Sequence, residues 1–471
     1  MKDSSANQNS GKGDSFFLIR TCITIALGGF LFGFDTAVIS GVIVFLKNKF
    51  VLDAFMEGWL VSSALIGCLI GVSFSGKLSD KFGPRKILFL SALFFLFSAI
   101  ITALSDSYMA IICGRIIGGL GIGAASMLSP LFISEFSPKY LRGRMVSLYQ
   151  FAITIGIVAA YFSNSFLLNF SLSENHLVNG FARRLLVDEV WRGMFGTLII
   201  PAALFILLLI FISESPRWLA KKGKDKHALE ILSRVNGRTN AEEEISVIKE
   251  SIKSENESLR QLLKPGLRKA LLIGLILPFA SQACGINAII YYGPKIFKDA
   301  GYALNDAFGT QVTIGLMNVF FTTLAIWKVD KFGRKPLLLS GMVGVFVSLV
   351  FIAIAFNFSI SNGILLLSFF LLFIACFAFS YGPVVWIIIA EIFPNRIRGR
   401  AMSISTFSLW FANIIIGQSF PWLLENLGPA GTFALFALIT LPATIFVWKV
   451  IPETKGKTLE EIEIFFSKSA I

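Results

Sequence analysis

The sequence predicts an all-α membrane protein with twelve transmembrane helices arranged as two six-helix halves, and three observations lead to this fold class. Of the 471 residues, 55% are hydrophobic and only 15% are charged, whereas soluble domains carry about 25% charged residues. Twelve apolar stretches have the length of about 20 residues that a bilayer-spanning helix needs. Two charged motifs also recur in both halves of the chain, which indicates a duplicated six-helix unit.

Short polar loops separate the predicted spans, except for one long polar segment after the sixth span. The spans lie near residues 17–40, 58–77, 87–105, 108–131, 146–168, 194–212, 268–293, 308–328, 336–357, 361–390, 401–424 and 431–450. The stretch 361–390 is long enough to be tilted or broken. In the long polar segment, Ile245, Ile248 and Ile252 recur at helical spacing, which predicts short amphipathic helices. The predicted domains are therefore 1–213, a linker over 214–267, and 268–471.

Lysine and arginine residues are distributed unevenly between the two sides of the predicted membrane. The side that holds both termini and the linker carries 34 of them, the other side carries 7, and Arg115 lies inside a span. Because cytoplasmic loops are enriched in Lys and Arg, both termini and the linker are predicted to be cytoplasmic. The chain is thus expected to be a multi-pass protein of the cell (inner or plasma) membrane, functional as a monomer. The net charge of +13 then follows from topology, and no nucleic-acid partner is expected.

Two motifs rich in acidic and basic residues recur in the predicted cytoplasmic loops. Asp-Lys-Phe-Gly follows the second and the eighth span at an offset of 250 residues, and a Glu…Arg-Gly-Arg motif follows the fourth and the tenth at an offset of 256. Glycine permits a tight turn, and arginine can bridge acids of adjacent helices. The motifs therefore predict a cytoplasmic gate, although they could also be simple positive-inside anchors. Its residues are Asp80, Gly83, Arg85, Glu135, Arg142, Arg144, Asp330, Gly333, Arg334, Glu391, Arg398 and Arg400.

Several further stretches carry a resemblance to a known family. They begin at Gly28 (Gly-Gly-Phe-Leu-Phe-Gly-Phe-Asp), Gly114 (Gly-Arg-Ile-Ile-Gly-Gly), Glu214 (Glu-Ser-Pro-Arg-Trp-Leu), Gly285 (Gly-Ile-Asn), Gly382 (Gly-Pro-Val-Val-Trp) and Pro452 (Pro-Glu-Thr-Lys-Gly). In this order they resemble the sugar porter family of the major facilitator superfamily, and within it the bacterial xylose–proton symporters. The resemblance implies the major facilitator fold, monosaccharide substrates and alternating access. One departure is Pro84, which stands where the family usually has arginine.

Among the charged residues, two stand out well inside predicted spans, Asp35 in the first and Arg115 in the fourth. A charge in a span costs at least about 2.5–3.5 kcal/mol on insertion scales, so it usually has a partner or a function. An Asp that pairs with Arg in one state and takes up a proton in another would act as a proton switch. The alternative is a permanent structural ion pair. Proton-coupled members of the family carry Asp here, which favours the switch, although their xylose carriers also have a Glu where this chain has Leu198.

A sugar site needs side chains that donate and accept hydrogen bonds, together with an aromatic face. On a regular helix Gln282 would point about 140° away from Asn287. Gly285 and Pro278 predict a bend or break that brings the two together. The alternative is that the polar amides only bond helix to helix. The motif match implies these substrate-binding residues: Phe32, Gln150, Ser281, Gln282, Asn287, Tyr291, Asn318, Trp386, Trp410 and Asn413.

Three positions near these residues are less polar than the family usually has, namely Ile157, Ser281 and Leu409. Fewer hydrogen bonds imply lower affinity or a different substrate.

The predicted function is secondary active import of a monosaccharide (hexose, pentose or related polyol) with a proton. The alternatives are a facilitative sugar uniporter, an exporter of the same fold, or a transporter-like nutrient sensor. No enzyme, cofactor or metal site is expected, because the sequence has no nucleotide-binding motif, metal-ligand spacing or nucleophile constellation. The expected partners are a small sugar, protons and the lipid bilayer.

Overall fold

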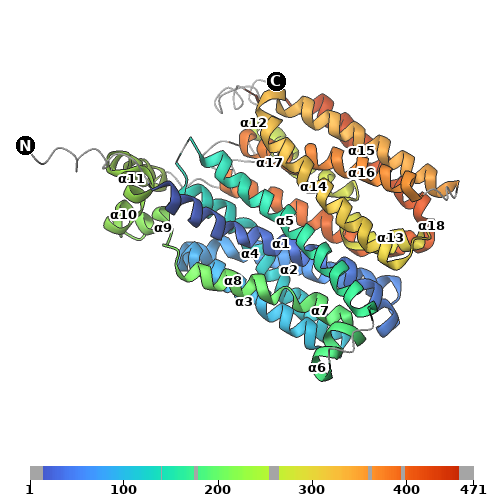
Figure 1. Ribbon diagram of the computed structural model, residues 1–471. Coiled ribbons are helices and arrows are strands. Elements are labelled where there is room, and N and C mark those ends of the chain that lie inside the picture. Colours follow the sequence, from blue (N-terminus) through green and yellow to red (C-terminus); the bar gives the residue numbers. More distant parts are fainter. Residues whose placement is uncertain are drawn as a thin grey trace, which may run out of the picture.

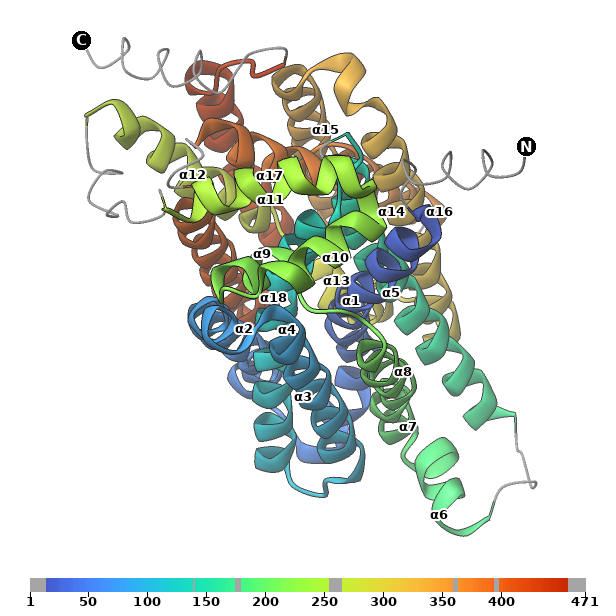
Figure 2. The same cartoon turned by 90° about the vertical axis from the view of Figure 1, so that its left-hand side faces the viewer.

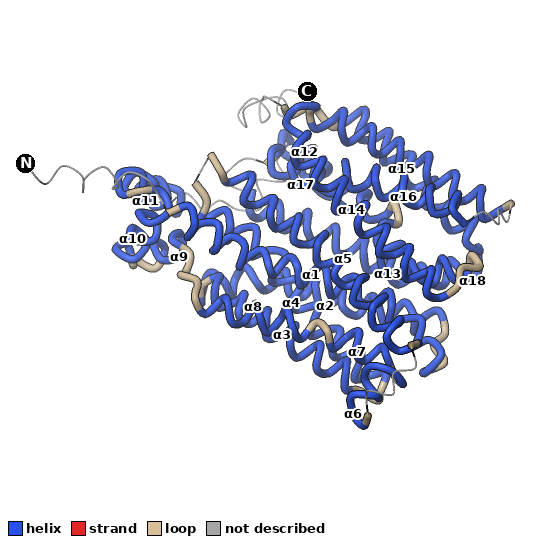
Figure 3. Tube along the Cα trace, in the orientation of Figure 1, coloured by secondary structure: helices blue, strands red, loops and turns tan. Residues whose placement is uncertain are grey.

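The computed structural model is a bundle of α-helices that run side by side, joined by short loops (Figures 1 and 3). It describes residues 14–138, 140–173, 179–253, 265–358, 363–393 and 398–455. Within these residues, eleven helical stretches are long and apolar enough to cross a membrane. The last of them contains Gly428, whose φ of 67° and ψ of 173° are not helical, so it consists of two helices. The predicted count of twelve spans is confirmed.

The first half of the bundle contains six spans, of which the sixth is divided. Its helices are α1 (Ser15–Phe50), α2 (Ala54–Phe82), α3 (Pro84–Leu104), α4 (Tyr108–Phe136), α5 (Arg142–Leu172), α6 (Gly180–Arg183), the π-helical turn η1 (Arg184–Asp188), α7 (Val190–Gly196) and α8 (Ile199–Ile210). The sixth span therefore consists of α7 and α8, where the sequence predicts one uninterrupted helix.

The second half repeats the pattern, with breaks in its first and fourth spans. Its helices are α12 (Pro265–Ala283), α13 (Ile286–Asp299), α14 (Leu304–Phe332), α15 (Arg334–Asn357), α16 (Gly363–Phe379), α17 (Tyr381–Ile392) and α18 (Arg398–Val450). Gly285 separates α12 from α13 with a φ of 87°, a conformation that other residues adopt only with strain. The expected breaks near Gly285 and within 361–390 are both confirmed.

Three short helices form the linker between the halves: α9 (Pro216–Lys221), α10 (Asp225–Asn236) and α11 (Arg238–Lys253). Leu219 and Ala228 pack there against Ile245 and Ile248, so the predicted amphipathic helices are present. The linker helices lie across one end of the bundle (Figure 2). That end is called the linker face below, and the other end is called the opposite face.

Glycines let neighbouring spans approach each other closely in the first half. A Cβ atom on Gly119 of α4 would lie 2.0 Å from the carbonyl oxygen of Ala64 in α2, and one on Gly33 of α1 would lie 2.0 Å from the carbonyl oxygen of Ile153 in α5. This close packing keeps α1 in the interior, with 78% of its most apolar window buried. Side chains of α1 are therefore positioned to face the other half rather than lipid.

Candidate transport site

A buried ion pair connects α1 and α4 in the middle of the first half. One guanidinium nitrogen of Arg115 lies 2.8 Å from a carboxylate oxygen of Asp35, and the two side chains are only 3% and 2% exposed. The same nitrogen is 3.4 Å from the Asp35 carbonyl oxygen. Two charges removed from water in this way depend on each other, because either one alone would be costly to bury. The structure thus brings the two predicted proton-coupling residues into direct contact.

A continuous network of amide side chains connects three helices of the second half. The Asn287 side-chain nitrogen donates to Gln282 Oε1 at 2.6 Å and to Asn413 Oδ1 at 2.7 Å. Gln282 Nε2 donates to Ser281 Oγ at 3.1 Å, and this hydroxyl donates to the Pro278 carbonyl at 2.7 Å. The break at Gly285 makes the Gln282–Asn287 contact possible, since a regular helix would keep these side chains apart.

An aromatic contact joins the two halves beside this network. The rings of Phe32 on α1 and Trp410 on α18 have centroids 5.5 Å apart. Phe32 precedes Asp35 by three residues, and Trp410 precedes Asn413 by three, so each ring lies on the same helix face as the polar residue. The charged pair and the amide network therefore flank one aromatic contact at the junction of the halves.

Four further predicted site residues lie on α5, α13, α14 and α17. Tyr291 is buried, whereas Gln150, Asn318 and Trp386 are half-buried. Asn318 Oδ1 accepts a hydrogen bond from Thr322 at 3.3 Å within its own helix. Half-buried amides such as Gln150 retain polar groups that could bind a ligand.

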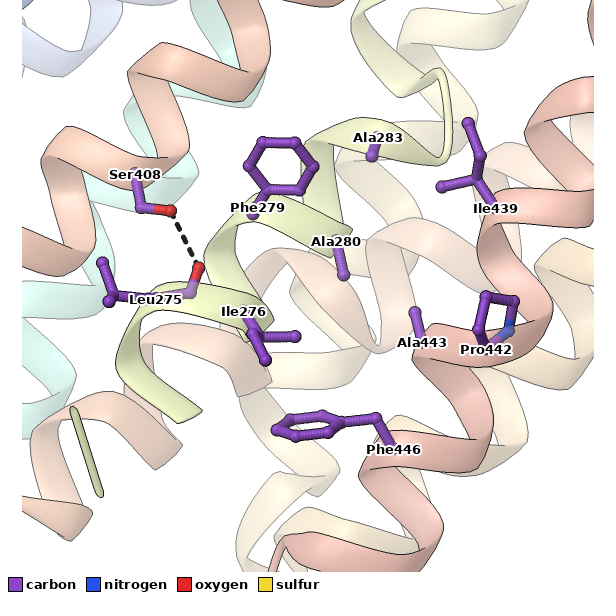
Figure 4. Close-up of a pocket in the computed structure, with 10 residues that line it drawn as sticks. All are labelled: Leu275, Ile276, Phe279, Ala280, Ala283, Ser408, Ile439, Pro442, Ala443 and Phe446. Atoms are coloured by element: carbon purple, nitrogen blue, oxygen red, sulfur yellow. Dashed lines mark hydrogen bonds between the residues drawn. The ribbon is translucent and has the colours of Figure 1, made fainter. Parts of the chain in front are cut away.

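A separate pocket of about 440 Å³ lies between α12 and α18 (Figure 4). It is lined by apolar side chains except for Ser408, whose hydroxyl donates to the Leu275 carbonyl at 2.8 Å. A sugar needs several hydrogen-bond donors and acceptors, whereas the one polar side chain that lines this pocket already donates to a backbone carbonyl. We therefore place the candidate sugar site at the amide network, which shares no residue with the pocket.

At the linker face of the first half, the carboxylate of Glu214 binds the start of α3. Its Oε1 accepts the backbone N–H groups of Arg85 and Ser215, each at 3.0 Å. Gly83 turns the chain there with a φ of 99°, and a Cβ atom on it would lie 2.4 Å from Glu214 Oε2. Ser215 donates to Glu135 at 2.5 Å. These contacts hold the end of the sixth span against the start of the third span and the end of the fourth.

The second half has the equivalent contacts around Glu453. Its two oxygens accept the N–H groups of Arg334, Lys335 and Lys455 at 2.8–3.0 Å. Thr454 donates to Glu391 at 2.5 Å, as Ser215 does to Glu135. The Arg334 guanidinium also binds Glu391, with Nε 3.2 Å and a terminal nitrogen 3.1 Å from Oε1.

The two capping carboxylates differ in their acidity. Burial raises the pKa of Glu214 and outweighs the backbone N–H groups of Arg85 and Ser215 that act against it. For Glu453, burial is opposed by the N–H groups of Lys455, Arg334 and Lys335, which together hold its pKa below the usual range. The difference follows from the number of donors and the depth of burial.

Several predicted gate residues have partners other than the expected ones. Asp80 accepts from Lys221 of the linker at 3.0 Å instead of from an arginine. Arg142 donates to the Ser134 carbonyl at 3.1 Å and lies 3.9 Å from Glu244 of the linker, so it does not bridge acids of neighbouring spans. Arg144 is exposed and pairs with none of the described residues. The side chains of Asp330, Arg398 and Arg400 lie outside the described residues.

Toward the opposite face, polar contacts join the two halves directly. Lys295 Nζ donates to Glu57 Oε1 at 2.6 Å, and Ser62 donates to Gln418 Oε1 at 2.6 Å. The Tyr161 hydroxyl donates to the Ile290 carbonyl at 3.2 Å. The structure thus has its two halves bonded together at the opposite face.

Sequence reasoning missed these contacts, as well as the capping role of Glu214 and Glu453. One signal for the caps was available, because each carboxylate follows the last span of its half and precedes a hydroxyl residue, Ser215 or Thr454. The inter-half contacts have no such signal, since they depend on how the halves pack together.

Comparison with known proteins adds to this geometry. The sequence model of the family described as "Sugar (and other) transporter" matches residues 21–466. The chain belongs to this sugar transporter family. An arabinose–proton symporter of Bacillus subtilis is 46% identical over 453 residues, 96% of either chain. The D-xylose–proton symporter of Escherichia coli K12 is 37% identical over 482 aligned residues, also 96% of either chain.

Solved structures of sugar transporter family members have the same fold. The partially occluded, inward-open structure of the xylose transporter XylE from E. coli has a TM-score of 0.82 and 35% identity, and covers 94% of this chain and 100% of that one. XylE bound to 6-bromo-6-deoxy-D-glucose has a TM-score of 0.81 and 37% identity, with 96% and 99% covered. The major facilitator fold and the expected family are confirmed, and the family is one of transporters rather than enzymes.

Proposed function

We propose that the protein imports a monosaccharide together with a proton by alternating access. The observation that carries this proposal is the position of a buried Asp35–Arg115 pair and a Gln282–Asn287–Asn413 amide network on the two sides of one inter-half aromatic contact. Relatives named as proton symporters of arabinose and xylose support the proposal. They also make pentoses the first substrates to test.

The proton side of the mechanism depends on Asp35. When Asp35 is ionised, Arg115 neutralises it at 2.8 Å. Protonation removes the negative charge and with it the attraction between the two side chains, so α1 and α4 are free to shift. Binding of a proton is thus converted into a change in helix packing at the junction of the halves.

The sugar side depends on neutral groups. Asn287 uses its side-chain nitrogen for Gln282 and Asn413, which leaves its Oδ1 to accept from a sugar hydroxyl. The Phe32 and Trp410 rings supply an apolar face for the sugar carbons. We include Gln150, Tyr291, Asn318 and Trp386 in the site on the family match. The hydroxyl of Ser281 is bonded within its own helix, so we assign it the orientation of Gln282 rather than contact with sugar.

The proposal also covers the orientation in the membrane and the domain boundaries. The linker face is cytoplasmic, and the protein acts as a monomer in the cell membrane. The linker is separated from the two halves at residues 213/214 and 267/268. An Asn240→Cys variant tests the orientation, since Asn240 is exposed on the linker helix α11. A membrane-impermeant thiol reagent should label it in broken cells but not in intact cells. Labelling in intact cells would overturn the orientation.

The function itself is tested by sugar uptake into proteoliposomes with and without an imposed pH gradient. The panel contains arabinose, xylose, glucose and a polyol. A gradient that is acidic outside should drive accumulation of at least one sugar. Uptake that equilibrates equally with and without the gradient would instead identify a uniporter.

A further inference from the structure

Four charged side chains meet at the opposite face, where the two halves touch. Lys47 at the end of α1 and Glu57 in the first turn of α2 belong to the first half. Lys295 of α13 and Glu425 of α18 belong to the second half. These four residues are called the seam cluster. Neither the proposed proton pair nor the proposed sugar network includes any of them.

The carboxylate of Glu57 is the centre of the seam cluster. It is fully buried, and its oxygens lie 2.6 Å from Lys295 Nζ and 3.0 Å from Lys47 Nζ. Lys47 is also 3.8 Å from Glu425, and these two side chains are 37% and 51% exposed. Glu57 therefore has one cationic partner in its own half and a second one in the other half.

Close backbone packing keeps water from Glu57. A Cβ atom on the adjacent Gly58 would lie 2.3 Å from the Gln418 carbonyl oxygen of α18. Gln418 in turn accepts from Ser62 and donates to the Phe55 carbonyl at 3.1 Å. An ion pair in such a dry place is strong once formed, and a lone carboxylate there would be costly.

We propose that Glu57 is a transport residue that changes partners during the cycle: it holds the opposite face closed through Lys295, and it relies on Lys47 alone when that face opens. This inference rests on the alternating access proposed above. When the halves separate, Lys295 moves into water with its own half. Glu57 keeps Lys47, so opening never leaves a buried carboxylate without a cation.

This arrangement predicts opposite effects for the two lysines. Lys295→Met removes the bond that exists only in the closed state, so it favours opening. Lys47→Met removes the partner that Glu57 needs in the open state, so it favours closure. Loss of the exposed Lys47–Glu425 contact changes the effect of Lys47→Met little, because surface ion pairs contribute little free energy. A cluster with a merely structural role would be weakened in the same direction by either change.

The test measures the opening of the seam by thiol labelling of a Val61→Cys reporter in lipid nanodiscs, where a hydrophilic reagent reaches both faces. Val61 is 1% exposed and lies 3.4 Å from the position of a Cβ on Gly417 across the seam. The reporter should be labelled roughly fivefold faster or more with Lys295→Met, and more slowly than the parent with Lys47→Met. Lys295→Arg should keep the parental rate.

Lys49→Met is the matched control, because Lys49 pairs with Glu189 inside the first half and should leave labelling unchanged. Equal labelling with Lys295→Met and Lys47→Met, or a shift of both in one direction, would overturn the proposal. The assay needs neither sugar nor proton gradient. A failure of proton coupling therefore shows only in the uptake assay, and a failure of the partner change shows only in the labelling assay.

Discussion

Glu214 in the first half and Glu453 in the second make the same type of contact at the linker face. Each carboxylate caps the helix that follows a glycine with positive φ, and each is followed by a hydroxyl that bonds to the glutamate ending the fourth or tenth span. The basic residue after the cap also matches, since Arg85 donates to the Leu209 carbonyl and Lys335 to the Trp448 carbonyl. A duplicated sequence has thus kept a duplicated set of bonds.

The two capping regions differ in which charged side chains bind near them. Arg334 binds Glu391 in the second half, whereas its counterpart Pro84 has no side-chain donor. In the first half the linker contributes instead, through Lys221 on Asp80 and the Trp218 indole on the Asp80 carbonyl. This difference teaches that the first-half contacts depend on the linker, while the second-half contacts are complete within the half.

The buried polar groups in the middle of the two halves differ more than the caps at the linker face do. The first half buries an ion pair, Asp35 and Arg115, and the second half buries neutral amides such as Gln282 and Asn413. A charge can respond to a proton, and a neutral amide can read hydroxyl groups without titrating. We infer that proton chemistry is confined to the first half, whereas most hydrogen bonds to the sugar come from the second.

The largest expected effect concerns this division. Asp35→Asn removes the charge but keeps the shape, so accumulation of sugar against a gradient should be lost, while exchange of sugar across the membrane persists. Uptake into proteoliposomes with and without a pH gradient measures both. Asp306→Asn removes an exposed carboxylate on α14 and should accumulate sugar as the parent does. If Asp35→Asn still responds to the gradient, the proton site lies elsewhere.

The next effect concerns the second half alone. Asn287→Ala should leave a sugar hydroxyl and two amides without partners, which costs about 1–3 kcal/mol, or roughly 5–150-fold in KM. The dependence of uptake on the pH gradient should remain. Asn426→Ala, which removes an exposed amide that donates to the Trp422 carbonyl of its own helix, is the control. Unchanged KM in Asn287→Ala would mean that the amides only join helices.

A smaller effect distinguishes the two caps. Both oxygens of Glu453 accept N–H groups, so Glu453→Gln must turn an NH₂ group toward a donor and should cost about 1–2 kcal/mol near pH 7.5. Glu214 accepts both of its bonds on Oε1, which Gln can reproduce, so Glu214→Gln should change stability by about 0.5 kcal/mol or less. Thermal unfolding in detergent at a fixed heating rate measures both.

The two pKa shifts predict opposite dependences of folding stability on pH. Because the pKa of Glu453 is lowered in the folded state, its ionised carboxylate stabilises the fold at pH values above its unfolded-state pKa. This stabilisation is lost as pH falls through its folded-state pKa. The raised pKa of Glu214 contributes stability at low pH that is lost as pH rises through the folded pKa. The penalty of Glu453→Gln should therefore shrink on acidification, whereas Glu214→Gln should become relatively less stable than the parent. Parallel pH profiles would contradict the difference.

The smallest effect concerns the orientation of one amide. Ser281→Ala removes the acceptor for Gln282 Nε2, so Gln282 can turn its amide, and KM should rise roughly threefold. Ser281→Thr keeps the hydroxyl and should restore the parental KM. The control is Ser408→Ala, which loses a similar hydroxyl-to-carbonyl bond beside the apolar pocket (Figure 4). Equal KM in Ser281→Ala and the parent would mean that Gln282 needs no such support.

Much of the fold could be predicted from the sequence, because span length and positive φ at glycine are local properties. The break at Gly285 is an example, and with it the meeting of Gln282 and Asn287. The divided sixth span was missed although Gly196 and Pro201 flank the turn near Thr197, because the stretch 194–212 is otherwise apolar and long enough for one span. Apolar pattern alone does not reveal such a turn.

The contacts across the halves could not be predicted in this way. Glu57 has the sequence context of an ordinary acidic first turn, and the packing of α2 against α18 together with Lys295 of α13 buries it. Arg142 likewise belongs to a motif typical of inter-span bridges, but the acid beside it is Glu244 of the linker. Which partner a long charged side chain chooses depends on the whole bundle and not on spacing in the sequence.

The non-helical backbone at Gly428 makes the number of membrane crossings even. Residues 398–450 would otherwise form one continuous helix of 53 residues, and the chain would cross the bilayer eleven times. With an odd number of crossings the first and last spans would end in different compartments. A single residue with positive φ turns the chain around, so that the end of the last span returns to the side where α1 begins.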